Sequence, residues 1–432
     1  MPLFVLDPAI WGPSGVNRRA YLRASLADLG ERVGGLQLRS GDPVDEVLAV
    51  ADAAGATTVH VAADFNPHGR ERDSAVERAL AAAGIKLVRT GSPYAVPPGQ
   101  VTKDDGTPYA VYTPYRRAWE GHDRPGPVAA PSGVEWLRPL PSVDLPAAAP
   151  ADDSRLPPAG EQAAHRRWSA FLADGIDSYD ADRNRPDLDR TSRMSVHLKW
   201  GEIHPRTMLA DLAGRPGDGA RTYRRELVWR EFYADVLWRR PDSAREHLRP
   251  QLAGMHHDPP GPLFEAWTEG RTGFPIVDAG MRQLRSEGWM HNRLRMIVAS
   301  FLVKDLHVDW RHGAQHFHRW LVDADLASNN HGWQWVAGSG TDPAPYYRVF
   351  NPVKQGRTFD PDGSYVRRHV AELADIPAPA VHEPWSMPGG PPAGYPAPIV
   401  DHHAERLEAL ARYQAVKSEA VAPEAGRLAA DR

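Results

Sequence analysis

The chain has 432 residues, of which 42% are hydrophobic and 25% charged, and its formal net charge is -4. This composition is typical of a globular protein of two or three domains. The absence of cysteine excludes disulfides, thiolate nucleophiles and Cys-ligated zinc or iron–sulfur sites. No apolar run approaches the ~18 residues of a membrane span, and no secretion signal is recognised, so a cytoplasmic location is expected. Nucleic-acid binding would need a local basic face.

The first ~115 residues alternate apolar strands with helical patterns. Strands are predicted at 2–7, 35–41, 57–65 and 85–91, with helices between them, one of which carries Leu22, Leu26, Leu29 and Val33 at helical spacing. Such alternation favours a parallel sheet covered by helices on both faces. We therefore predict an α/β domain over residues 1–118, with ligand sites beyond the carboxyl ends of its strands.

The chain changes character after this domain. Nine prolines lie within residues 121–158, and a linker between domains is predicted over 119–160. From residue 161 the pattern is helical, and a helical domain is predicted over 161–416, followed by a flexible tail at 417–432. The helical segments expected in this domain are 160–176, 222–238, 276–288, 289–306, 315–330 and 401–417.

The predicted helix 222–238 carries an unusual combination of side chains on one face. Glu226, Trp229, Arg230 and Tyr233 fall on the same side at helical spacing, and the opposite side is apolar. A carboxylate, an indole, a guanidinium and a phenol on one face favour a binding site. An ordinary amphipathic helix with an ion pair remains the alternative.

The predicted helix 289–306 repeats this design. Asn292, Arg295 and Met296 lie opposite an apolar stripe, and Arg293 lies at the flank. A rigid helix with a polar face of this kind suits a preorganised pocket. An exposed basic helix is the alternative.

Two short segments are ambiguous by themselves. Thr and Ser in residues 191–195 could cap a helix, which is the favoured interpretation, or bind an anion such as phosphate. Asp323 and Asp325 supply too few oxygen ligands for a Mg²⁺ or Ca²⁺ site, so no metal site is predicted and arginine partners are preferred. No GxGxxG sequence and no P-loop is present.

Segments 226–233, 288–306, 309–311, 322–335 and 344–352 together resemble the DNA photolyase/cryptochrome family, above all class I cyclobutane pyrimidine dimer photolyases. The resemblance covers nearly the whole chain. It implies an N-terminal α/β domain, a linker and a helical domain that binds FAD. It also implies light-driven repair of DNA that contains pyrimidine dimers: excited reduced FAD passes an electron to a flipped-out dimer, the ring splits, and the electron returns.

The resemblance also implies roles for individual residues. Arg295 and Asp323 are expected to pair beside the isoalloxazine, and Asn329 is expected to face flavin N5. The residues that match the FAD pocket are Tyr179, Thr191, Ser192, Arg193, Met194, Ser195, Arg230, Asn292, Arg295, Asp323, Ala324, Asp325 and Asn329. Those that match the dimer pocket are Glu226, Trp229, Asn292, Met296 and Trp335. Those expected at the DNA backbone are Arg293, Lys199, Arg348 and Lys354.

Electron supply to the flavin is expected to depart from the family pattern. Trp333 and Trp310 match the inner and middle tryptophans of a three-tryptophan chain, but His257 stands at the outer position. We therefore predict slow or rerouted photoreduction of oxidised FAD. Trp335 cannot share the role of Trp333, because residues two apart on a helix point about 200° from one another.

An antenna site is expected around Arg18, Asp64, Gly69 and Arg70, where Gly69 would allow close approach of a ring. The segment 64–73 resembles members that bind 8-hydroxy-5-deazaflavin more than those that bind a reduced folate. A plain turn between strand and helix is the alternative.

The resemblance matches the strand at 2–7 to the second strand of the family's sheet, so the central first strand and its helix are expected to be missing. A start placed too late is favoured over a natural exposed sheet edge, which would be a liability. Alternative functions are a cryptochrome-type flavin photoreceptor, a (6-4) photolyase and a light-independent DNA-binding structural protein. A monomer is expected.

Overall fold

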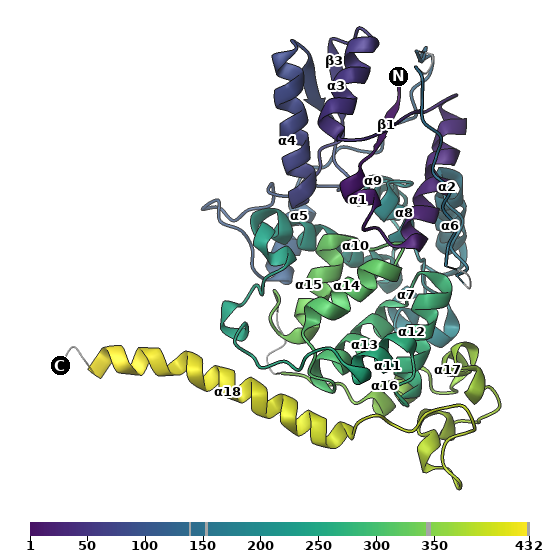
Figure 1. The fold of residues 1–432 in the computed structure, drawn as a ribbon, viewed down its shortest axis with the longest axis vertical. Coiled ribbons are helices and arrows are strands. Elements are labelled where there is room, and N and C mark those ends of the chain that lie inside the picture. The colour runs from purple at the N-terminus through teal and green to yellow at the C-terminus, as the bar shows by residue number, and fades with distance from the viewer. Residues whose placement is uncertain (138–139, 152–153, 343–346, 430–432) are drawn as a thin grey trace. The chain divides into compact units, whose positions relative to one another are not determined.

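The computed structural model describes residues 1–137, 140–151, 154–342 and 347–429, with side chains of the last helix described as far as Ser418. Contacts divide the chain into two units. The first comprises Met1–Ala181, Thr191–Pro241 and Arg319–Ala327, and the second comprises Asp182–Arg190, Asp242–His318 and Ser328–Arg432. Both units therefore contain parts of the predicted helical domain, and strands occur only near the N-terminus of the described chain (Figure 1).

All four predicted strands are present, as β1 (Leu3–Leu6), β2 (Gln37–Ser40), β3 (Thr58–Val61) and β4 (Lys86–Arg89). Their parallel pairing is confirmed: β1 pairs with β2, and β3 with β4. The strands form two separate pairs, and no ladder joins β1 to β3 within the described residues.

Short helices connect these strands, as the alternating pattern predicts. They are α1 (Pro8–Trp11), α2 (Val16–Arg32), α3 (Pro43–Ala53) and α4 (Pro67–Ala82). Asp42 caps α3 and Asn66 caps α4, each through a side-chain oxygen that accepts a backbone N–H, and a proline follows each cap. Val76 and Leu80 of α4 are buried in an apolar cluster beneath the helices.

The predicted linker contacts the α/β part at residues 141–143 and 151. Between α5 (Tyr112–Gly121) and α6 (Glu161–Asp174), the described residues contain no helix or strand. The Val143 amide donates to Leu38 O at 3.1 Å, which adds one backbone hydrogen bond beside β2. The Asn17 side chain of α2 accepts from the Ala151 amide and donates to Trp320 O.

The remaining helices of the first unit surround two aromatic cores. α7 (Tyr179–Asp182), α8 (Ser195–Trp200) and α9 (Pro205–Leu212) precede the long α10 (Asp218–Arg239). Leu227, Val228 and Phe232 are buried, as predicted. The same helix also buries Glu231 and Asp235, which accept hydrogen bonds from backbone amides in residues 95–99. These carboxylates join α10 to the segment that follows β4.

The second unit is helical. Its helices are α11 (Pro262–Glu269), α12 (Pro275–Glu287), α13 (Asn292–Lys304), most of α14 (Trp310–Trp320) and α15 (Leu326–Ala337), α16 (Pro352–Phe359), α17 (Ser364–His369) and α18 (His402–Ala429), with short 3-10 turns at 241–244, 250–252, 371–373, 380–382 and 384–386. α12 is almost entirely buried and packs against α11, α13, α16 and α17. α18 continues through most of the segment expected as a tail.

One predicted helix is wrong. The pattern predicts a continuous helix over 315–330, whereas α14 ends at Trp320 and α15 begins at Leu326. The carbonyl of Val322, in the break, accepts the indole N–H of Trp200 at 3.0 Å. Residues 321–324 are buried, so this non-helical turn is held by packing and by a side-chain donor. Local sequence spacing contains no information about that donor.

Candidate functional site

The polar face of α10 is organised around an aromatic stack. The ring of Trp229 lies flat on Tyr112 at a centroid distance of 3.6 Å and an interplanar angle of 5°. The Tyr112 hydroxyl donates to Arg225 O at 2.7 Å, which fixes this ring. Burial, and then the negative charge of Glu226, raise the pKa of the Tyr112 phenol. Glu226 and Trp229 therefore face the same neighbour, as expected for a shared site.

Arg230 makes three contacts on the same face of α10. Its guanidinium donates to Pro93 O at 3.1 Å and to Leu198 O at 3.4 Å, and it lies 4.5 Å from the ring of Tyr94. Burial raises the pKa of Tyr94, and the charge of Asp325 raises it further. Arg230 and Asp325, both predicted for the flavin pocket, thus converge on one tyrosine. Tyr94 itself was missed, because its partners are remote in sequence.

Residues 191–195 form a tight turn before α8. The helix cap is Met194, and no side chain caps α8, so the favoured prediction of simple capping is wrong. Instead, the Ser192 hydroxyl lies 2.8 Å from the Tyr223 hydroxyl, and the Tyr223 ring lies 5.0 Å from that of Tyr179. The structure thus brings Tyr179 and Ser192 together through Tyr223, which sequence reasoning missed.

The same turn has two features that fit a bound anion. The Thr191 Oγ1 atom is buried and has no hydrogen-bond partner in the structure. Arg193 has a φ of 53°, a left-handed conformation that non-glycine residues rarely adopt. An unsatisfied buried hydroxyl is costly unless a ligand completes its hydrogen bonds. The turn therefore fits the phosphate group of a cofactor.

In the second unit, α13 presents its predicted polar face. Asn292 is exposed and half-buried Met296 lies one turn along, with Nδ2 and Sδ 4.0 Å apart. The Arg295 guanidinium donates from Nε to Met290 O at 2.9 Å. His291 caps the helix by accepting from the Arg293 amide. These contacts orient the start of α13, so the predicted side chains lie on a fixed element.

Three arginines gather beside this helix. Burial lowers the pKa of Arg293 to about 10, and the positive charges of Arg183 and Arg348 contribute. The Arg293 side chain donates to Asn184 Oδ1 at 2.8 Å and lies 4.3 Å from the Phe359 ring. The structure thus groups Arg293 with Arg348, two of the predicted DNA-backbone contacts, and adds Arg183. Exposed Lys354 lies on α16, and Lys199 lies 5.9 Å from the Trp200 ring in the first unit.

The α15 sequence "NNHGWQW" contains both buried residues that form hydrogen bonds and candidate site residues. Asn330, His331 and Gln334 are buried and bond to Ala244 O and to the side chain and carbonyl of Ser243. The Asn329 Nδ2 atom donates to Ala314 O at 3.2 Å and to Asn330 Oδ1 at 2.9 Å. The structural role of the three buried polar residues was not predicted.

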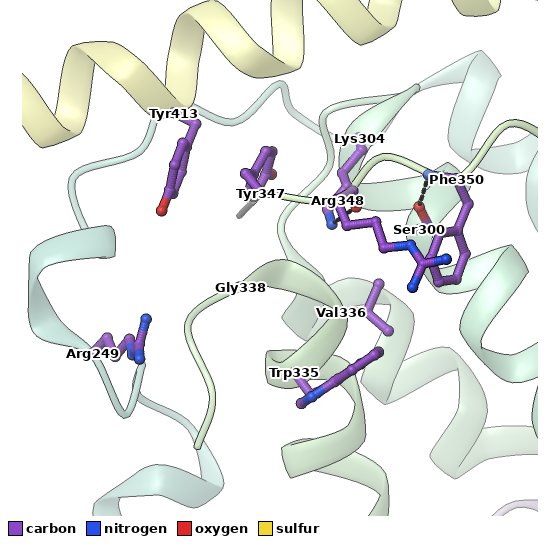
Figure 2. A pocket seen from close by; sticks show the side chains of 10 residues that line it. All are labelled: Arg249, Ser300, Lys304, Trp335, Val336, Gly338, Tyr347, Arg348, Phe350 and Tyr413. Carbon is purple, nitrogen blue, oxygen red and sulfur yellow. Dashed lines mark hydrogen bonds between the residues drawn. The ribbon is translucent and has the colours of Figure 1, made fainter. Parts of the chain in front are cut away.

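Trp335 lines a small cavity together with Arg348 and Lys304 (Figure 2). The cavity holds about 70 Å³ of space that water can reach. The Trp335 indole donates to Asp342 O at 3.1 Å. Lys304 Nζ donates to Arg348 O at 2.5 Å and lies 4.4 Å from the Tyr347 ring, so the buried lysine holds the segment that carries Arg348. Residues 344–346 of the motif 344–352 lie outside the described residues.

The two tryptophans of the predicted electron chain are both deeply buried. Trp310 is 1% exposed and Trp333 is 3% exposed, and neither Nε1 atom has a hydrogen-bond partner in the structure. His257, at the predicted outer position, lies 3.9 Å from Asp309 Oδ2. Burial lowers the pKa of His257, which favours the neutral imidazole. The role of Trp310 stays a prediction, as does the pairing of Arg295 with Asp323.

The residues expected at the antenna site are only partly brought together. The space beside Gly69 is filled by the Asp64 side chain, which a Cβ at position 69 would overlap. Gly69 therefore accommodates Asp64, and the expectation that it admits a ring stays a prediction. Arg70 turns toward α10, where it donates to Trp238 O at 3.2 Å. Arg18, on α2, is largely buried, burial lowers its pKa, and its Nε has no hydrogen-bond partner.

Neither a metal-ion cluster nor a membrane-spanning helix is present among the residues that the structure describes. They contain no cluster of three or more His, Cys, Asp or Glu side chains suited to a metal ion. None of the helices combines the length and the apolar character that crossing a membrane requires.

Comparison with known proteins identifies the family. Residues 1–132 match the family model for DNA photolyase, and residues 223–415 match the model for the FAD-binding domain of DNA photolyase. The chain belongs to the DNA photolyase family. The deoxyribodipyrimidine photo-lyase of Halobacterium salinarum is 39% identical over 445 residues, covering 96% of this chain and 92% of that protein. The Streptomyces griseus enzyme of the same name is 40% identical, with the same coverage of both chains.

A solved photolyase confirms the architecture of an α/β part followed by a helical FAD domain. The bacterial class III photolyase from Agrobacterium tumefaciens matches with a TM-score of 0.91 and 36% identity, covering 97% of this chain and 92% of that photolyase. The second family model makes residues 223–415 an FAD-binding domain. It includes Trp229 of the aromatic stack and the polar face of α13.

Proposed function

We propose that this photolyase splits cyclobutane pyrimidine dimers in DNA under blue light. The observation that carries the proposal is the α10 face, where Glu226 and Trp229 both face a fixed tyrosine, in a chain 38–40% identical to deoxyribodipyrimidine photo-lyases. When bound, reduced FAD supplies the photoexcited electron that opens the cyclobutane ring.

The residues proposed to contact the dimer are Glu226, Trp229, Asn292, Met296 and Trp335. The Glu226 carboxyl binds the polar edge of a flipped pyrimidine by hydrogen bonding. Trp229 offers one indole face, since Tyr112 covers the other. Asn292 adds an amide, and Met296 adds an adaptable apolar contact. Trp335, which lines the cavity beside Arg348, contributes its indole as a wall.

FAD is held by residues with distinct tasks. Thr191 Oγ1, buried and without a partner, and the left-handed turn at Arg193 receive phosphate oxygens. Arg230 and Arg295 supply positive charge that stabilises the anionic reduced flavin, with Asp323 orienting Arg295. Asn329 has its amide nitrogen committed to two acceptors, so its Oδ1 atom is offered to the ring. The other FAD residues are Tyr179, Ser192, Met194, Ser195, Asn292, Ala324 and Asp325.

One assay separates this proposal from its alternatives. The chemically reduced protein is mixed with an oligonucleotide that carries a defined thymine dimer and is illuminated with blue light. Loss of the dimer supports the proposal, and Glu226→Gln should reduce the repair yield at unchanged FAD content. Glu120→Gln, on the exposed end of α5, is the matched control. No dimer loss would defeat the repair proposal in favour of a photoreceptor or a DNA-binding protein, and loss of only (6-4) lesions would reassign the enzyme.

A second light-absorbing group, 8-hydroxy-5-deazaflavin, is the antenna in this proposal, with a reduced folate as the less favoured option. The support is Arg18, a largely buried guanidinium whose Nε has no hydrogen-bond partner and which an anionic ligand would satisfy. The absorption spectrum of the purified protein decides the antenna's identity, since a deazaflavin absorbs visible light and a folate the near ultraviolet. An unchanged absorption spectrum in Arg18→Ala would show that Arg18 does not bind the antenna.

DNA is bound through a basic surface by a monomer. Arg293 and Arg348, grouped with Arg183, contact the phosphates, and Lys199 and Lys354 extend the contact. Sedimentation of the protein with and without DNA tests the monomer.

A further inference from the structure

Trp333 has an aromatic neighbour that the three-tryptophan pattern does not include. The ring of Trp267, on α11, lies edge-on to Trp333 at a centroid distance of 6.1 Å and an angle of 73°. Phe317 contacts both rings, at 5.0 Å from Trp333 and 6.4 Å from Trp267. Trp310 makes no ring contact with Trp333 in the part of the chain that the structure describes. Trp333 is therefore coupled through direct ring contact to Trp267.

The indole N–H groups of the two candidate donors differ in their surroundings. The Trp267 indole N–H donates to Val298 O at 3.0 Å, so the negative end of a carbonyl dipole faces the group that becomes more positive on oxidation. The Trp310 Nε1 atom has no such acceptor, and the nearby Arg311 guanidinium is paired with Asp309 and Glu246. One-electron oxidation is thus easier at Trp267.

Trp267 has a partly exposed aromatic neighbour, and the Trp310 branch ends at a histidine. Trp267 is 0% exposed, but half-buried Phe264 stacks on it at 5.8 Å. His312 in turn lies 6.1 Å from the Phe264 ring. Beyond Trp310, the outer position is held by His257, an imidazole that is much harder to oxidise than an indole.

We propose that Trp267 is the electron donor to oxidised Trp333 in this photolyase, an inference that rests on the proposed function. Trp333 first gives one electron to the photoexcited oxidised flavin and becomes a radical cation. One electron then passes from Trp267 to Trp333, which returns to its neutral form and leaves the radical cation on Trp267. The Val298 carbonyl is too weak a base to take the indole proton, so Trp267 keeps it. An external thiol gives the electron that restores Trp267.

The test compares holoprotein variants by flash photolysis with an added thiol. Trp267→Phe should slow steady photoreduction about tenfold and shorten the life of the tryptophan radical, whereas Trp310→Phe should change it less than about twofold. Trp168→Phe is the matched control, because Trp168 is equally buried and also donates its indole N–H, to Asp211. In flavin-free protein, near-ultraviolet circular dichroism should lose an indole couplet in Trp267→Phe, which reports the ring pair independently of photochemistry.

Each remaining outcome bears on the proposal. Fluorescence of oxidised FAD should stay quenched in Trp267→Phe, since Trp333 performs the first step. The inference would be overturned if Trp267→Phe is photoreduced at the wild-type rate and Trp310→Phe is not photoreduced. If Trp267→Phe does not fold, Trp267→Tyr should show the same slowing, because tyrosine oxidation needs a proton acceptor. His257→Trp should rescue either variant by completing the Trp310 branch. Failure of the reduced wild type to repair dimers would instead overturn the proposed function.

Discussion

The effect of pH on stability can be worked out for Lys304, the last residue of α13. The side chain is 4% exposed, and burial lowers its pKa from 10.5 to about 7, with Arg348 contributing and Asp305 opposing. Because the folded-state pKa lies below the unfolded value, the unfolded chain binds one more proton between these values. Stability therefore rises with pH across this window and falls as pH drops through it.

The magnitude follows from the size of this window. A fall from 10.5 to about 7 corresponds to at most about 5 kcal/mol. An unfolding entropy of about 2.1 cal/mol/K per residue makes this roughly 5 °C in Tm for a chain of this length. Lys304→Met removes the titrating group, so the variant should be more stable than wild type near pH 7, and its advantage should shrink toward pH 10.5.

The assay is thermal unfolding, followed by tryptophan fluorescence, of wild type and Lys304→Met across that window. Lys86→Met, at an exposed lysine on β4, is the matched control and should leave the pH profile unchanged. Parallel profiles for wild type and Lys304→Met would refute the reasoning. They would mean that the Arg348 carbonyl and the Tyr347 ring keep Lys304 protonated in the folded protein.

Three further outcomes are expected. Glu231→Gln should cost about 2–4 kcal/mol in denaturant unfolding, because this buried carboxylate accepts two backbone amides and the Trp119 indole, and an amide cannot accept all three. Gly69→Ala should displace Asp64 and lower antenna content, measured as antenna absorbance per FAD; an unchanged ratio would separate Gly69 from the antenna. Arg293→Ala should reduce the slope of log DNA affinity against log salt by about one. An unchanged slope would show that Arg293 does not contact a phosphate.

Regular patterns were predictable because they arise from local spacing. All four strands, their parallel pairing and the helices α10 and α13 follow from the period of apolar residues. On α10, Trp229 stacks on Tyr112 and Arg230 lies over the ring of Tyr94, and the role of this face as a binding site stays a prediction. Longer-range features did not follow. The break between α14 and α15 depends on an indole donor from α8 that spacing does not reveal.

Buried charge was not predicted from the sequence. The pattern did not single out Glu231 or Asp235, yet they are 2% and 1% exposed. Their hydrogen-bond partners lie more than a hundred residues away in the sequence, so only the folded chain reveals why they are tolerated. Tyr94, Tyr223 and Lys304 were missed for the same reason.

The parallel stack of Trp229 on Tyr112 has a kinetic consequence for ligand capture. The indole is immobilised when the protein folds, so its rotamer freedom is already lost before DNA arrives. Binding then needs no ordering of this side chain, because the ligand meets a surface that is already rigid. Differences in affinity between lesions should therefore appear mainly as differences in how fast each lesion leaves.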